Sequence, residues 1–124
     1  TLVCWNKMVL LGLEVAEECA QLGIDIEVID PRTLQPLDEN LIFKSVEKTN
    51  RLLILEEGWG VASLGCYIVD RVVKERFDYL DAPPERVFNH FVPMPYNENL
   101  ENEVMPNKQR LLEAIHRLVE ASPL

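Results

Sequence analysis

Short apolar runs alternate with longer amphipathic stretches along this chain. Apolar and β-branched residues gather in four short segments that we expect to be strands, at 2–5, 24–29, 52–55 and 86–88. Elsewhere apolar residues recur every three or four positions, which predicts helices over 8–22, 41–49, 68–76 and 111–119. Strands that alternate with helices favour an α/β fold with a mostly parallel sheet. Because helices then cover both sheet faces, the predicted architecture is a three-layer sandwich.

The third predicted strand differs from the second in its pattern. Leu52–Leu55 is an unbroken apolar run bounded by charged residues, whereas the segment 24–29 alternates apolar with acidic residues. A strand that is buried on both faces has no polar side to alternate with. We therefore expect Leu52–Leu55 at the centre of the sheet.

Proline dominates the region between the fourth strand and the last helix. Pro93, Pro95 and Pro106 are expected to keep Phe91–Met105 mostly extended or looped, with one helical turn over Leu100–Val104. The region is too short and too aromatic for a linker between domains. We expect an ordered surface loop.

Composition and charge narrow the class of protein. The 124 residues are 48% hydrophobic, enough for one domain over 1–124 with a core that needs no metal or disulfide. A net charge of −9 argues against nucleic acid, which requires a basic surface. No apolar run reaches the roughly 18 residues that span a bilayer, so no membrane partner is expected. Three cysteines without a C-x-x-C pair suggest free thiols in a reducing compartment.

The first residues suggest that this domain comes from a longer chain. Thr1 is not an initiator methionine, and the residues that follow it already have the pattern of a buried strand. We expect the natural chain to continue upstream.

The loop after Leu55 is where an open α/β sheet would place a ligand. Gly60 and Gly65 bracket four residues as in a phosphate loop, but Cys66 and Tyr67 stand where that motif needs Lys and Ser or Thr. A plain strand-to-helix turn is the simpler interpretation. Glu56 and Glu57 point opposite ways on an extended backbone, so they are not an acid/base pair. One is expected to cap the following helix and the other to form an interface ion pair.

The remaining reactive side chains are isolated in sequence. His90 and His116 have no partner four residues away that would suggest a metal site or a relay. Cys66 lies near a predicted helix start, where the helix dipole would lower its pKa. An inert buried thiol is the alternative for Cys66.

Large aromatic side chains and a methionine crowd the loop-rich half of the chain: Trp59, Phe77, Tyr79, Phe88, Phe91, Met94 and Tyr96. Rigid aromatic residues and methionine are favoured at the centres of protein interfaces. They also serve as anchors for a lid over a sheet edge. The sequence leaves both interpretations open.

Five strings of residues follow one another along the chain in a recognisable order: Ile26–Asp38, Ser45–Leu52, Glu56–Trp59, Leu80–Pro83 and Val92–Tyr96. Together they resemble one known family, the C-terminal transketolase-type domain of the pyruvate dehydrogenase β subunit, and the resemblance covers essentially the whole chain. Related 2-oxo acid and acetoin dehydrogenase β subunits share much of this pattern.

Two segments depart from the family pattern. Phe88-Asn89-His90-Phe91 stands where the family usually has Thr-Gly-x-Asp, and Gly60-Val61-Ala62-Ser63 replaces Pro-Gln-Phe-Gly. A loop contact made by the family's Asp is therefore absent at Phe91. The packing after Trp59 is also expected to differ.

The resemblance implies a parent enzyme that decarboxylates pyruvate on thiamine diphosphate and acylates a lipoyl domain. In that family the magnesium-diphosphate motif and the activating carboxylate lie outside this domain, so we expect no catalytic, cofactor-binding or metal-binding residue here. The resemblance implies assembly with an α subunit and a second β subunit. The expected interface residues are Glu56, Trp59, Phe91, Met94 and Tyr96.

The resemblance also implies docking to the dihydrolipoyl acyltransferase core. In related complexes a basic binding domain meets acidic β-subunit surface, which an acidic domain suits. Asp81, Glu85 and the terminal carboxylate of Leu124 are the candidates. The implied location is cytoplasmic in a bacterium, and the mitochondrial matrix or plastid in a eukaryote.

Two other functions stay open at the level of sequence. The first is a stand-alone regulatory module that binds an anion or nucleotide at the carboxyl edge of the sheet. The second is an independent thiol enzyme that uses Cys66.

Overall fold

A computed structural model describes residues 1–121 of the chain. Its elements follow in the order β1 (Leu2–Cys4), α1 (Met8–Gln21), β2 (Val28–Ile29), α2 (Glu39–Thr49), β3 (Leu53–Trp59), α3 (Leu64–Arg76), the 3-10 helix η1 (Phe77–Tyr79), β4 (Glu85–Asn89), α4 (Glu98–Val104) and α5 (Lys108–Glu120). Strands alternate with helices through most of the chain, as the apolar pattern predicts.

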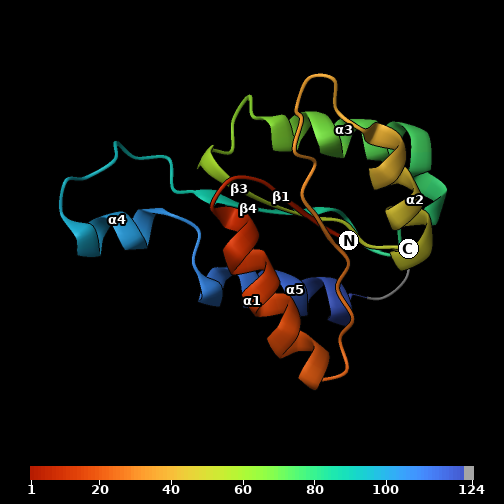
Figure 1. The fold of residues 1–124 in the computed structure, drawn as a ribbon, viewed down its shortest axis with the longest axis horizontal. Helices are drawn as coiled ribbons and strands as arrows, with labels where there is room; N and C mark the ends of the chain where they lie inside the picture. Colours follow the sequence, from red (N-terminus) through yellow and green to blue (C-terminus); the bar gives the residue numbers. More distant parts are fainter. Residues whose placement is uncertain (122–124) are drawn as a thin grey trace.

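The four strands form one sheet in the order β2-β1-β3-β4, and every neighbouring pair is parallel. Helices α1 and α5 lie on one face of the sheet, and α2 and α3 lie on the other (Figure 1). This arrangement confirms the predicted three-layer α/β sandwich. It also places β1 and β3 at the centre of the sheet, as expected for Leu52–Leu55.

Alternate residues of the central strands enter two separate cores. Leu53 and Leu55 pack toward α1 and α5, whereas Ile54 packs toward α2 and α3. All three are at most 3% exposed. The period of two along a strand is what divides the apolar residues between the two faces.

The segment 24–29 forms a shorter strand than the sequence predicts. Only Val28 and Ile29 enter the sheet, where they pair with Leu2 and Val3 of β1. The alternating pattern continues upstream to Ile24, but β1 begins at Leu2, whose backbone N–H donates to the carbonyl of Glu27 at 2.9 Å. The paired residues of β1 and β2 start at Leu2 and Val28, so the residues before Glu27 lie outside the ladder.

Strand β3 is longer than predicted and includes most of the expected ligand loop. It runs to Trp59, with a register shift between Leu55 and Trp59 in its pairing with β4. Gly58 has φ +100 within this irregularity, a conformation that glycine adopts without strain. The prediction of a loop at 56–60 is therefore wrong, since a bulge lets the strand continue.

Between β4 and α5 the chain leaves the body of the domain. Residues 90–103, which we call the arm, extend beyond the carboxyl end of β4 and include most of α4 (Figure 1). The expected helical turn at Leu100–Val104 is present and starts earlier, at Glu98, because the Asn97 side chain accepts hydrogen bonds from the backbone N–H groups of Asn99 and Leu100.

Candidate functional site

An exposed aromatic pair marks the base of the arm. Trp59, the last residue of β3, lies against Phe91 with ring centroids 4.6 Å apart. The Trp59 indole N–H donates to the backbone carbonyl of Val92 at 3.3 Å. Even so, Trp59 is 49% exposed and Phe91 is 68% exposed. The pair is held in place by the chain but not covered by it.

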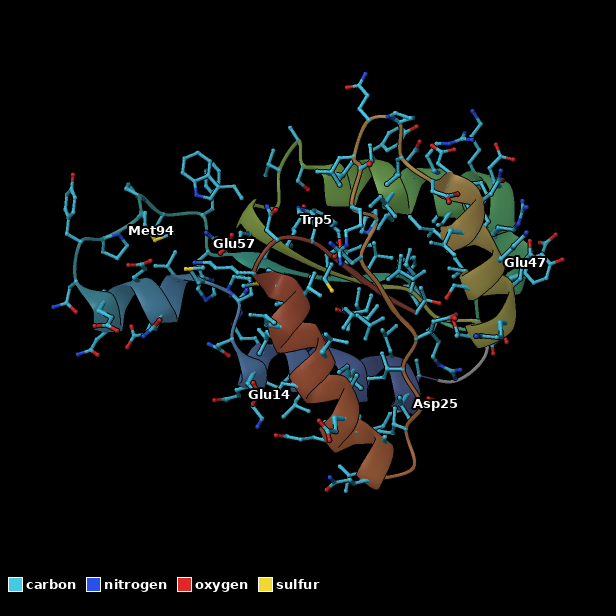
Figure 2. The ribbon with its side chains drawn as sticks, in the orientation of Figure 1. Trp5, Glu14, Asp25, Glu47, Glu57 and Met94 are labelled. Carbon is cyan, nitrogen blue, oxygen red and sulfur yellow. The ribbon has the colours of Figure 1, made fainter. Side chains whose placement is uncertain are left out.

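The arm contains no buried side chain. Every one of its fourteen residues is exposed except Pro95 and Glu101, which are half-buried. Met94 lies well away from the sheet (Figure 2), and Tyr96 is fully exposed at 107% of its reference area. Apolar and aromatic side chains grouped on one exposed segment are typical of an interaction surface.

The two ends of the arm are nevertheless joined to each other. The backbone N–H of His90 donates to the carbonyl of Val104 at 2.9 Å, and we call this junction the neck of the arm. Arg110 of α5 donates to the carbonyl of Phe88 at 2.6 Å and to that of Met105 at 3.3 Å. Val104 is buried, so both ends of the arm are fixed to the domain.

Glu56 lies behind this surface and is only 1% exposed. Its carboxylate accepts hydrogen bonds from the Ser63 hydroxyl at 2.7 Å and from the backbone N–H of Gly65 at 3.1 Å. The Arg86 guanidinium is 3.7 Å away. Glu56 therefore binds the start of α3, as expected for one of the two adjacent glutamates. A contribution of Glu56 to an interface would act by holding residues 57–63 in place.

Glu57 points to the other side, toward the start of α1 (Figure 2). One of its carboxylate oxygens is 3.0 Å from the Lys7 ammonium. The ion pair predicted for the second glutamate thus has a partner within the domain.

The two departures from the family pattern pack against each other. Phe88 covers Gly60, where an added Cβ would lie 2.5 Å from the ring. The Arg86 guanidinium lies over the Phe88 ring, 4.9 Å from its centroid. Phe91 in turn packs on Trp59. The two segments are therefore in contact through Phe88 and Gly60.

Cys66 lies in the first turn of α3 and is half-buried. Hydrogen bonds from the backbone and hydroxyl of Ser63 lower the pKa of the Cys66 thiol, and Arg86 adds a smaller contribution. Ser63 is the N-cap of α3, so the residue that caps the helix also perturbs this thiol. In contrast, burial raises the pKa of Cys4 to about 12.

The predicted docking residues lie at the opposite end of β4 from the arm. Asp81 is 3.7 Å from Arg51, and both carboxylate oxygens of Glu85 face Arg117 at 3.1 and 3.3 Å. The structure thus places Asp81 and Glu85 at the amino end of β4, and Trp59 and Phe91 at its carboxyl end. Leu124 lies outside the described residues.

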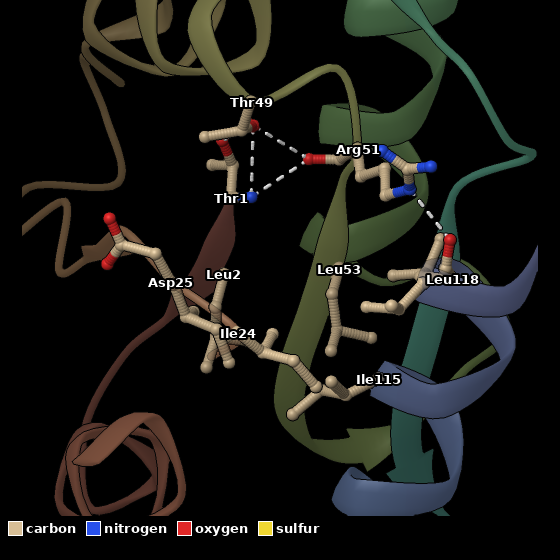
Figure 3. A pocket seen from close by; sticks show the side chains of 11 residues that line it. Thr1, Leu2, Ile24, Asp25, Thr49, Arg51, Leu53, Ile115 and Leu118 are labelled. Carbon is tan, nitrogen blue, oxygen red and sulfur yellow. Dashed lines mark hydrogen bonds between the residues drawn. The ribbon is translucent and has the colours of Figure 1, made fainter. Parts of the chain in front are cut away.

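Two hollows bear on the ligand-binding alternative. One, of about 380 Å³, lies beyond the carboxyl ends of β1 and β2, but its Lys7 and Arg32 are already paired with Glu57 and Asp30. The other, of about 230 Å³, lies at the amino edge between β1, β3 and α5 (Figure 3). Its Arg51 donates to the carbonyl of Leu118 and so faces a backbone group. Neither hollow presents a cation that is free to bind an anion.

Among residues 1–121 no three His, Cys, Asp or Glu side chains are grouped closely enough to bind a metal ion. No helix in the same range is both long and apolar enough to cross a membrane. His90 and His116 are both exposed and lie on different elements.

Sequence reasoning missed two residues of this region. Arg110 donates hydrogen bonds to the carbonyls of Phe88 and Met105, which lie 22 and 5 residues before it in the chain. No local sequence pattern predicts such contacts. Ser63 is the other, although a serine just before an apolar helical repeat is a recognisable N-cap signal.

Comparison with known proteins gives consistent results. Residues 1–111 match the family model "Transketolase, C-terminal domain". The chain is 46% identical over 118 residues to the pyruvate dehydrogenase E1 component subunit beta of Rickettsia felis, covering 95% of this chain and 36% of that protein. It is 42% identical over 120 residues to the mitochondrial form from Dictyostelium discoideum, covering 97% and 34%.

A solved structure described as a split-gene transketolase, inactive beta4 tetramer, superposes with a TM-score of 0.81 at 21% identity. It covers 98% of this chain, which corresponds to 38% of that chain. The chain thus spans about a third of the length of its curated relatives. With a matching family model over 111 residues and the expected sheet and layers, this chain belongs to the transketolase C-terminal domain family.

Proposed function

We propose that this chain is the C-terminal domain of a pyruvate dehydrogenase E1 β subunit and that its role is to assemble the enzyme. The observation that carries the proposal is the arm, a segment whose apolar side chains are left largely exposed by residues 1–121. The similarity to E1 β subunits over 95% of the chain is the basis for proposing pyruvate dehydrogenase as the parent enzyme. The surface formed by Trp59, Phe91, Met94 and Tyr96 is then a contact with other subunits of the enzyme.

The parent enzyme would decarboxylate pyruvate on thiamine diphosphate and pass the acyl group to a lipoyl domain. The described residues offer no group of three His, Cys, Asp or Glu side chains for a magnesium ion, and the buried carboxylate of Glu56 is already bound by Ser63 and Gly65. The donor set in residues 1–121 does not fit a diphosphate-magnesium group. We therefore assign this domain no step of the reaction. The location follows the source of the parent: cytoplasmic in a bacterium, mitochondrial matrix or plastid in a eukaryote.

The test uses the full β subunit with the arm altered by Phe91→Ala and Tyr96→Ala. We expect subunit assembly, measured by sedimentation with the α subunit, to need at least about tenfold higher concentration than wild type. The matched control is Tyr79→Ala, which removes an exposed tyrosine outside the arm. Unchanged assembly by the arm variants, with intact fold, would contradict the proposal. Turnover of pyruvate by the 124-residue chain alone would also contradict it.

We also propose a second role, docking of the acyltransferase core at the edge that carries Asp81 and Glu85. Both carboxylates are partly exposed, and each faces an arginine of this domain. A basic partner would have to compete with Arg117 for Glu85. The expected result is that Arg117→Ala strengthens binding of the acyltransferase's basic binding domain and Glu85→Gln weakens it, measured by calorimetry with the full β subunit.

A further inference from the structure

We propose that the hollow at the amino edge of the sheet holds an apolar side chain of the same polypeptide, from the segment that is joined to the Thr1 nitrogen in the parent β subunit. This inference rests on the proposed function, since the matched residues make up 36% of the length of a β subunit relative. It goes further by assigning one surface of the domain to the rest of that chain.

Thr1 already takes part in the pairing of β1 with β3. Its nitrogen donates to the carbonyl of Arg51 at 2.9 Å, and its carbonyl accepts from the backbone N–H of Leu53 at 2.8 Å. These two bonds continue the parallel ladder one residue beyond Leu2, where β1 begins. Thr1 also lines the hollow. A residue joined to the Thr1 nitrogen therefore lies next to this space.

The period of two along a strand decides which way that residue points. Leu2 and Cys4 pack toward α1 and α5, whereas Val3 packs toward α2 and α3. The side chain of Thr1 faces α2, because its hydroxyl lies 2.6 Å from that of Ser45. The side chain that precedes Thr1 is therefore directed to the same face as Leu2, which is the face that contains the hollow (Figure 3).

The walls of the hollow are mostly apolar. The apolar lining residues are Leu2, Ile24, Ile26, Leu53, Ile115, Leu118 and Val119. The volume of about 230 Å³ is larger than the roughly 150 Å³ that holds a benzene-sized group. The one cation in the lining, Arg51, already donates to the carbonyl of Leu118 at 2.7 Å. An aliphatic or aromatic side chain suits this space, and a charged side chain would be buried there without a partner.

The surroundings of the Thr1 nitrogen suit an amide better than a charged group. Burial lowers the pKa of the Thr1 ammonium to about 6, because the nitrogen is poorly solvated. An amide N–H needs only one acceptor, and the Arg51 carbonyl provides it. A chain that continues through Thr1 keeps this bond and removes the charge.

The first test is the identity of the residue immediately before Thr1 in the parent β subunit. We expect a Val, Ile, Leu, Met or Phe residue. A charged residue, Asn or Gln at that position would overturn the proposal.

The second test is hydrogen exchange, measured by mass spectrometry on the full β subunit. The residue immediately before Thr1 is changed to Ala, and the matched control changes the residue two positions before Thr1, which alternation directs to the opposite face. Peptides that contain Leu53 report the effect, because its N–H donates to the Thr1 carbonyl. Exchange there is expected to be at least about tenfold faster in the first variant and less than about threefold faster in the control. Unchanged exchange in α3 would show that the domain stays folded.

A double variant tests whether the side chain contacts the wall of the hollow. Combined with Ile24→Ala, the Ala variant before Thr1 is expected to change exchange at Leu53 by a factor that differs at least about threefold from the product of the single effects. The control partner is Leu37→Ala, which lies on the α2 and α3 side and should give the simple product. Exchange at Leu53 that none of the changes before Thr1 affects, or equal coupling to Ile24 and Leu37, would overturn the proposal.

The outcomes separate this inference from the assembly role of the arm. If these variants leave exchange at Leu53 unchanged while Phe91→Ala and Tyr96→Ala weaken assembly, only the occupant of the hollow is wrong. If the arm variants leave assembly unchanged while exchange at Leu53 responds as expected, the assembly role is wrong and the assignment of the hollow stands.

Discussion

The carboxylate of Glu56 occupies the space where a side chain on residue 65 would have to lie. It accepts a hydrogen bond from the Gly65 backbone N–H at 3.1 Å, and a Cβ added to Gly65 would overlap the Glu56 carboxyl group. The glycine is needed for this close approach. The end of β3 and the start of α3 are thereby joined beneath the exposed Trp59.

This relationship predicts that Gly65→Ala destabilises the domain although alanine is the better helix former. Displacing a buried carboxylate from its hydrogen bonds is expected to cost about 2 kcal/mol or more, measured by urea unfolding. The double variant with Glu56→Ala is the control, because the carboxylate is then gone. A cost of Gly65→Ala that is equally large in the Glu56→Ala background would show that overlap is not the cause.

The exposed aromatic residues should matter more for association than for folding. Tyr96→Ala is expected to change the free energy of unfolding of the 124-residue chain by less than about 0.5 kcal/mol, because the side chain is fully exposed. Trp59→Ala should cost about 1 kcal/mol, since half of its surface is covered. Chemical denaturation of the chain measures both. A loss above about 2 kcal/mol for Tyr96→Ala would mean that the arm supports the fold.

Cys66 should be the most reactive of the three cysteines. Its pKa is lowered by hydrogen bonds from Ser63, whereas burial raises the pKa of Cys4 and, with help from Glu18, that of Cys19. At pH 7 alkylation of Cys66 by iodoacetamide, followed by mass spectrometry, is expected to be at least about tenfold faster than that of Cys4.

Ser63 provides the control for this thiol. Ser63→Thr keeps the hydroxyl and should leave the rate unchanged, whereas Ser63→Ala should raise the pKa of Cys66 and slow alkylation at pH 7. If the two variants react alike, the Ser63 hydroxyl does not contribute to the lowered pKa of Cys66, and the backbone hydrogen bond of residue 63, which both variants keep, is the cause. Fast alkylation of Cys66 by itself would not establish catalysis, because the hydrogen-bonded cap accounts for it.

A surface network predicts a specific dependence of stability on pH. The Tyr67 hydroxyl donates to Glu39 at 2.5 Å, and this bond, with Arg71, lowers the pKa of Glu39. A carboxyl with a lowered pKa in the folded state stabilises above its unfolded pKa and loses that contribution as the pH falls. Tyr67→Phe should therefore destabilise the chain at pH 7 but have little effect near pH 3.

Urea unfolding between pH 3 and pH 8 measures this difference. Tyr79→Phe is the matched control, because Tyr79 is similarly exposed and lies outside the network. The same bond raises the pKa of Tyr67, so the contribution should also fade as the pH rises through the pKa of that tyrosine. A Tyr67→Phe effect that is constant across the range would contradict the assignment.

The layers of this fold could be predicted because they depend on local patterns. The apolar run Leu52–Leu55 indicates a central strand, and Asp38 marks the start of α2, where its side chain accepts from the Leu41 N–H. Such signals lie within a few residues of the element that they specify.

The rest depends on contacts between distant parts of the chain. Strand β2 is short because β1 supplies few partners, and β3 continues to Trp59 because β4 pairs with it past the bulge. The interface predicted from the aromatic residues stays a prediction, although the structure shows that those residues are exposed. The hydrogen bond from Arg110 to the carbonyl of Phe88 could not be predicted from the spacing of residues in the sequence.

The closed neck of the arm has a consequence for the kinetics of assembly. The ends of this loop are joined before a partner binds. The entropy lost on closing the loop therefore does not reduce the free energy of binding. Opening the neck with Arg110→Ala would add that entropic cost to binding, although Arg110 acts only through the carbonyls of Phe88 and Met105. A residue on the last helix, remote from the contact, would then help to set how long two subunits stay together.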